Sequence, residues 1–111
     1  MLVSRSSPFG GQTRTLVLVA LKLLDESFPR ELARVLDVSL NGVQQALRGL
    51  EKDGLVAGRA AGRTRLYRLN PSYFARQELD DYLGRLSEPE DELSSRIAGL
   101  RKRPRRPGKP L

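Results

Sequence analysis

The chain has 111 residues, enough for one small domain with a single modest hydrophobic core. It contains no Cys and no His, which excludes disulfides, thiol chemistry and nearly every zinc site, and removes the commonest general base. Its 20 basic and 13 acidic side chains give a formal net charge of +7, which favours a polyanionic partner.

The basic charge is concentrated in two segments. Residues 55–70 contain four arginines and no acid, and residues 100–111 contain six basic side chains. Residues 71–99, which lie between them, are acidic overall. We expect the two basic segments to contact the polyanion and the acidic block to face away from it.

The first elements are an arm and a helix. Residues 1–12 are rich in Ser, Gly and Pro and predict a flexible N-terminal arm. From Thr13 the apolar residues recur at helical spacing, up to the break at residues 25–29. The apolar run 16–24 is too short to span a membrane, and the N-terminus lacks the pattern of a signal peptide. We therefore expect a cytoplasmic protein with no membrane partner.

Two further helices follow, separated by three residues. "PRELARVL" (29–36) predicts a short helix with Pro29 in its first turn, and Ser39 can cap the helix that begins after it. In that helix Val43, Ala46, Leu47 and Leu50 share one face. The nearly opposite face carries Asn41, Gln44, Gln45 and Arg48. Gly54 is expected to end this helix in a left-handed conformation.

The rest of the chain predicts a hairpin, helices and a tail. Residues 55–70 have the pattern of two short strands joined by a glycine turn near "AAGR" (60–63). A further helix is expected from Pro71, and a short last helix ends near Leu100. The tail 101–111, rich in proline and basic residues, is expected to be disordered.

The segment "PRELARVLDVSLNGVQQALRGLEKDGLVAGRAAGRTRLYRLNP" (29–71) carries a family resemblance. It resembles the winged helix-turn-helix domain of small bacterial and archaeal transcriptional regulators of the ArsR-like family. The resemblance implies a mostly α fold with a small β-hairpin wing and a C-terminal helical extension. It divides the chain into an arm (1–12), a DNA-binding domain (13–70), C-terminal helices for dimerisation (71–100) and a basic tail (101–111).

The resemblance also implies which residues would bind double-stranded DNA. In such domains the second helix of the motif enters the major groove, and the wing reaches the neighbouring minor groove or the backbone. Amides can pair with adenine and arginine with guanine or phosphate. The expected contacts on the recognition helix are Ser39, Asn41, Gln44, Gln45 and Arg48. Those on the wing are Arg59, Arg63, Thr64 and Arg65.

The C-terminal helix has two interpretations, a core helix or a dimer helix. Its apolar stripe is longer than a three-helix core needs, and related regulators pair through such helices, so a homodimer reading a pseudo-palindromic site is favoured. The expected dimer contacts are Leu79, Tyr82, Leu83 and Leu86. The acidic residues nearby are interpreted as solvated surface, or else as a docking site for a basic partner.

Other functions remain open at this point. The domain could serve as an interaction or adaptor module in a larger assembly, or could bind RNA, although few aromatic residues are available for base stacking. An enzyme is not expected, because no paired-carboxylate, thiol, imidazole or phosphate-cradling motif is present. No metal or cofactor is expected, since the metal-sensing members of the family use Cys and His, and any small-molecule effector is unknown.

Overall fold

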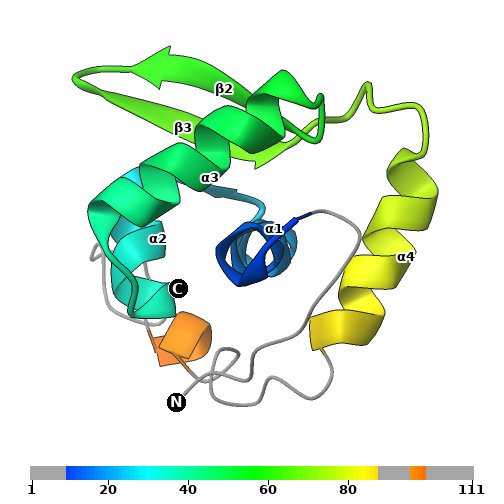
Figure 1. Cartoon of the computed structure of the whole chain (residues 1–111), viewed down its shortest axis with the longest axis horizontal. Coiled ribbons are helices and arrows are strands. Elements are labelled where there is room, and N and C mark those ends of the chain that lie inside the picture. Colours follow the sequence, from blue (N-terminus) through cyan, green and yellow to red (C-terminus); the bar gives the residue numbers. More distant parts are fainter. Residues whose placement is uncertain (1–9, 88–95, 100–111) are drawn as a thin grey trace, which may run out of the picture.

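The computed structural model describes residues 10–87 and 96–99. Three helices precede a hairpin, and a fourth helix follows it (Figure 1). The elements are α1 (Gln12–Leu24), β1 (Glu26–Ser27), α2 (Pro29–Leu36), α3 (Leu40–Lys52), β2 (Val56–Ala61), β3 (Thr64–Leu69) and α4 (Arg76–Ser87). Residues 96–99 form one further helical turn. The predicted arm up to residue 9, the predicted tail and residues 88–95 lie outside the described residues.

Helix α1 is the centre of the fold. Figure 1 shows it end-on in the middle, with α2 and α3 on one side and α4 on the other. Because other elements surround it, residues 15–21 are buried without interruption, and α1 is apolar on nearly every side. Val43, Leu47 and Leu50 of α3 belong to the same core and have no exposed side-chain surface. The core therefore fixes α3 through its apolar face and leaves the other face outward.

The turn between α2 and α3 has the predicted length and cap. Residues 37–39 connect the helices, with Asp37 in the left-handed region at φ 58°. The Ser39 Oγ accepts a hydrogen bond of 3.0 Å from the backbone N–H of Gly42, which confirms Ser39 as the N-cap of α3. Gly54 ends the helix region at φ 83°, a conformation that favours glycine.

The sheet has a strand that the sequence does not predict. The sequence indicates only a helix end at residues 25–29, but Glu26 and Ser27 form β1 and pair antiparallel with β3. The strand order is β1-β3-β2, so the hairpin is the larger part of a three-stranded sheet. β1 forms because the turn after α1 brings the chain back beside the free edge of β3. Ser27 is buried there, and its Oγ donates a 2.6 Å hydrogen bond to Glu31.

Helix α4 begins later than predicted. The sequence predicts this helix from Pro71, but residues 70–75 contain turns and α4 starts at Arg76. The Asn70 side chain explains the difference. Its Oδ1 accepts a 2.9 Å bond from the N–H of Ser72, and its Nδ2 donates a 3.0 Å bond to the carbonyl of Gly54. These bonds hold the chain in an Asx turn at the base of the hairpin instead of a helical turn.

The apolar face of α4 packs against α1. Leu79 and Leu83 are 3% and 0% exposed and belong to the core of the single chain. They have almost no surface left to contact a second copy. Of the four expected dimer contacts, Tyr82 is 37% exposed and Leu86 is partly buried. No helix in residues 10–87 or 96–99 combines the length and apolar character that crossing a membrane requires.

Candidate nucleic-acid interface

The outward face of α3 carries the predicted polar stripe. Asn41, Gln44, Gln45 and Arg48 are all exposed, and the apolar residues between them are buried. The stripe is outward because α1 and α2 cover the opposite face of the helix. Ser39 is also exposed, but its Oγ is occupied by the cap of α3.

The hairpin lies beside α3, and its two faces differ (Figure 1). In an antiparallel pair, residues opposite one another point to the same side. Ala60 lies opposite Arg65 and Gly58 opposite Tyr67, so Arg65 shares a face with Tyr67, which packs into the core. Arg59 lies opposite Leu66 and therefore points to the other face. The predicted wing arginines are thus divided between two sides of the sheet.

Helix α3 and the hairpin enclose a groove with a volume of about 440 Å³. Five of the residues predicted from the sequence line it: Gln44, Arg48, Arg63, Thr64 and Arg65. Pro29, Ala60 and Tyr67 complete its lining. Ser39, Asn41, Gln45 and Arg59 do not line the groove. The five predicted residues therefore bring one amide, one hydroxyl and three guanidinium groups together in one place.

The comparisons with solved structures find the same architecture. Reduced HlyU from Vibrio cholerae is 28% identical with a TM-score of 0.52, and the match covers 68% of this chain and 75% of HlyU. A mutant of Lactococcus lactis ZitR, solved in complex with DNA, is 20% identical with a TM-score of 0.54, over 90% of this chain and 77% of ZitR. The adhesin competence repressor AdcR from Streptococcus pyogenes is 19% identical with a TM-score of 0.51, over 79% and 73% of the two chains. No protein-family model matches the sequence, and neither does any curated protein.

The chain has a winged helix-turn-helix fold. This confirms the fold that residues 29–71 predict through their resemblance to ArsR-like regulators. Helices α2 and α3 are the helix-turn-helix, with α3 in the position of the recognition helix. β2 and β3 are the wing, and α4 is the helical extension that follows it.

One wing arginine is clamped to the recognition helix. Arg65 donates a 2.9 Å hydrogen bond to Glu51 of α3 and a 3.2 Å bond to the carbonyl of Gly58. Its guanidinium also lies 5.7 Å from the ring centre of Tyr67, within cation–π range. The hydrogen bond to Glu51, followed by the charge of Glu51, raises the pKa of Arg65 above its ordinary value. Arg65 is therefore a fixed, fully charged group beside α3.

Gly58 makes this clamp possible. A Cβ atom at Gly58 would lie 2.7 Å from Arg65 Nε and 2.9 Å from Tyr67 Cε2, too close for either side chain to stay in place. The sequence alone does not identify the clamp or the part of Glu51 in it. The signal that the sequence does contain is a glycine inside a strand, which often marks a close approach of another group.

The cations around the groove differ in whether they are paired. Arg65 is held by Glu51, and Arg59 is held on the far face by Glu26, with Nη2 at 3.2 Å from both carboxylate oxygens. In the part of the chain that the structure describes, Arg48 and Arg63 have no side-chain hydrogen bond or ion pair. Both are exposed. Arg48 and Arg63 are therefore the groove's available anion-binding groups.

Proposed function

We propose that this winged helix-turn-helix protein is a transcriptional regulator that binds double-stranded DNA in a sequence-dependent way. The observation that supports the proposal best is the groove, where Arg48 and Arg63 from two different elements join the amide of Gln44. Neither arginine has a side-chain partner among residues 10–87 and 96–99. The similar fold of ZitR has been solved in complex with DNA, which is further support. A groove with this lining suits phosphate oxygens and base edges at the same time.

In this proposal α3 enters the major groove with its polar stripe toward the bases. The Gln44 amide can donate and accept at once, as the N6 and N7 atoms of adenine require. Arg48 binds guanine or a phosphate, and Arg63 at the wing tip binds the backbone or the minor groove. Asn41 and Gln45 contact neighbouring bases or phosphates, and the capping Ser39 contacts a phosphate. Thr64 and Arg65 contact the backbone beside Arg63.

The protein binds as a cytoplasmic homodimer, so that two recognition helices read the two halves of a pseudo-palindromic site. The surface available for the second copy excludes Leu79 and Leu83, which the core already uses. Tyr82 and Leu86 keep exposed surface on α4, and Phe74, just before that helix, is 91% exposed. These three side chains support pairing along the outer side of α4.

Selection of binding sites from a random DNA pool tests this function. We expect an enriched sequence with two related halves. Gln44→Ala should lower the affinity for that sequence by on the order of 1–3 kcal/mol for each half of the site, because one base-pair contact is lost in each half, and should leave affinity for unrelated DNA nearly unchanged. Band-shift titrations at fixed salt, with each base pair varied in turn, measure this. A parent protein that enriches no sequence, or a Gln44→Ala variant with unchanged preference, would count against the proposal.

The clamp on Arg65 gives a second expectation. Glu51→Gln removes a negative charge next to the groove and releases the Arg65 guanidinium, so affinity for any duplex should rise by roughly threefold to tenfold. Fluorescence anisotropy with a specific and an unrelated duplex measures the change. Glu78→Gln, which alters an exposed carboxylate on α4, is the matched control and should have no effect. Weaker binding by Glu51→Gln would instead mean that the clamp positions Arg65 for DNA.

A further inference from the structure

A second hollow lies between the end of α1, the strands β1 and β3, and the start of α4. Its volume is about 390 Å³, within the range of roughly 300–1,000 Å³ that is usual for small-ligand sites. It shares no lining residue with the groove beside α3. Leu21, Leu69 and Pro71 give it an apolar wall, and the rest of its lining is charged.

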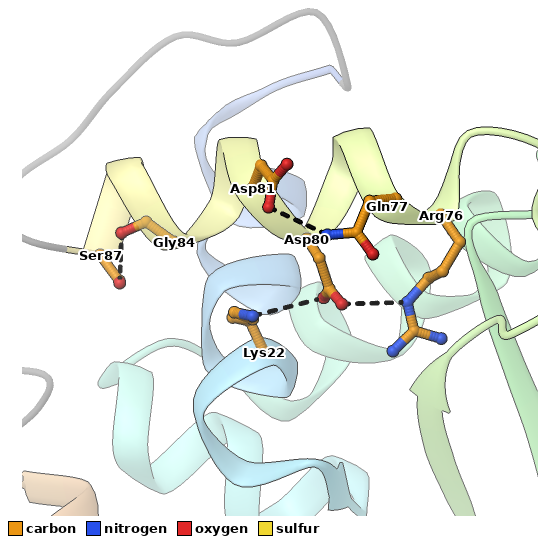
Figure 2. A network of polar contacts seen from close by, with 7 residues as sticks. All are labelled: Lys22, Arg76, Gln77, Asp80, Asp81, Gly84 and Ser87. Atoms are coloured by element: carbon orange, nitrogen blue, oxygen red, sulfur yellow. Dashed lines mark hydrogen bonds and ion pairs between the residues drawn. The ribbon is translucent and has the colours of Figure 1, made fainter.

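On one side of this hollow two cations share a single carboxylate at long distances. Asp80 lies between Lys22 and Arg76, with a distance of 3.5 Å to each nitrogen (Figure 2). Charge-assisted hydrogen bonds are normally shorter, about 2.7–2.9 Å. The Arg76 Nε is buried and makes no hydrogen bond within the described part of the chain. Asp80 therefore offsets only one of the two positive charges, and the guanidinium of Arg76 keeps N–H groups that can donate to an oxygen ligand.

Two further charges of the hollow are opposite in sign and have no side-chain partner within the described residues. Arg68 and Asp25 both line it, and in residues 10–87 and 96–99 neither side chain makes a hydrogen bond or an ion pair. Glu26 adds a second carboxylate next to Asp25 in the sequence. An anion with several charges would be repelled by these carboxylates, and a simple cation would be repelled by Arg68 and Arg76. A molecule with one charge of each sign would be attracted to both.

We propose that this hollow binds a small zwitterion of the α-amino-acid type. The carboxylate of the ligand contacts the guanidinium groups of Arg68 and Arg76, which suit the two oxygens of a carboxylate. Its ammonium group contacts Asp25 and Glu26. An aliphatic portion lies against Leu21, Leu69 and Pro71. The site is separate from the surface that the proposed function assigns to DNA.

Glu26 connects this site to the wing. The same carboxylate that lines the hollow holds Arg59 of β2 at 3.2 Å. An ammonium group bound at Glu26 competes with Arg59 for that carboxylate and weakens the ion pair between Glu26 and the wing. Binding of the zwitterion therefore changes DNA affinity, a consequence that rests on the proposed function. The binding itself does not depend on DNA.

The test is a titration of the full chain with each of a panel of standard L-α-amino acids, in which ¹H–¹⁵N NMR spectra monitor binding. At least one amino acid should give saturable shifts, centred on the amides around Asp25 and Arg68. Its N-acetyl derivative, which lacks the cation, and its amide derivative, which lacks the carboxylate, should bind at least about tenfold more weakly. These two derivatives separate the contribution of each end of the ligand.

Substitutions of residues that line the hollow test the same ligand site. Arg68→Gln and Asp25→Asn should each weaken binding by at least about tenfold. Asn has nearly the same size and shape as Asp, so this variant changes the charge at position 25 without changing the space that the side chain occupies. Arg85→Gln, outside the hollow, is the control and should bind as the parent does.

The proposal is overturned if no amino acid in the panel gives saturable shifts, if the two derivatives bind as well as the parent ligand, or if the two variants bind the ligand as the parent protein does.

DNA titrations with and without the amino acid, at constant salt, separate the ligand site from the proposed DNA-binding function. Saturable binding with unaltered DNA affinity would overturn the link through Glu26 and leave the site intact. Absence of DNA binding in the ligand-free protein would overturn the proposed function and leave the NMR result unaffected.

Discussion

The double charge reversal R48E/R63E is expected to lower the affinity for duplex DNA by about 100-fold or more. Both arginines line the groove between α3 and the wing, and neither is neutralised by another side chain of the described residues. The reversal removes two attractions to phosphate or base oxygens and creates two repulsions, and like charges placed together cost several kcal/mol. Because the lost contacts are mostly electrostatic, the dependence of affinity on salt should become shallower.

The matched control for this variant is R68E/R85E. Arg68 lies on the wing strand β3 but lines the other hollow, and Arg85 is exposed on α4. The control changes the net charge by the same amount, so it measures the effect of overall charge alone, which should be a few-fold. Circular dichroism and thermal unfolding should be nearly unchanged in both proteins, because all four arginines are exposed. Equal losses of DNA affinity in the two variants would mean that the groove is not the DNA surface.

The helices could be predicted from the sequence because their signals are local. The apolar spacing after Thr13, the cap at Ser39 and the left-handed Gly54 each depend on a few neighbouring residues, and the structure has all three. The stripe of amides and Arg48 on α3 was equally predictable. Once Val43 and Leu47 face the core, the helical period leaves Gln44 and Arg48 outside.

The features that the sequence does not predict depend on contacts between distant residues. β1 has only two residues and forms because β3, about forty residues later, offers an edge. The sequence places the start of α4 too early because the Asn70 side chain bonds both Ser72 and Gly54, and the second bond requires the folded hairpin. The Glu51–Arg65 and Glu26–Arg59 pairs likewise join separate elements. Composition shows the charges but not which of them neutralise one another.

The division of the wing arginines could have been predicted from the register of the hairpin. A two-residue turn at Gly62 and Arg63 places Ala61 opposite Thr64, and therefore Ala60 opposite Arg65 and Arg59 opposite Leu66. Strand alternation then puts Arg59 and Arg65 on different faces. Treating all the arginines of residues 55–70 as one group does not show that they lie on different faces of the sheet. The difference bears on the proposed function, because Arg65 and Arg63 line the groove and Arg59 does not.

Leu83→Ala is expected to reduce the free energy of unfolding by about 2–5 kcal/mol. Leu83 is completely buried between α4 and α1, so truncation leaves a cavity in addition to the lost transfer energy. A domain of this size is stable by only about 5–15 kcal/mol, so the loss is a large part of the total. Urea unfolding followed by circular dichroism measures it.

The same experiment distinguishes the core role of α4 from its proposed role in dimerisation. If Leu83 packs only within its own chain, Leu83→Ala should reduce the free energy of unfolding equally at low and high protein concentration. Stability that depends on association would instead vary with concentration. Tyr82→Ala, one residue away and 37% exposed, provides the contrast. It should change the stability of the monomer less and shift the monomer–dimer equilibrium in sedimentation toward the monomer. If Leu83→Ala instead separated a dimer and left the unfolding of the monomer unchanged, α4 would pack between two chains and not on α1.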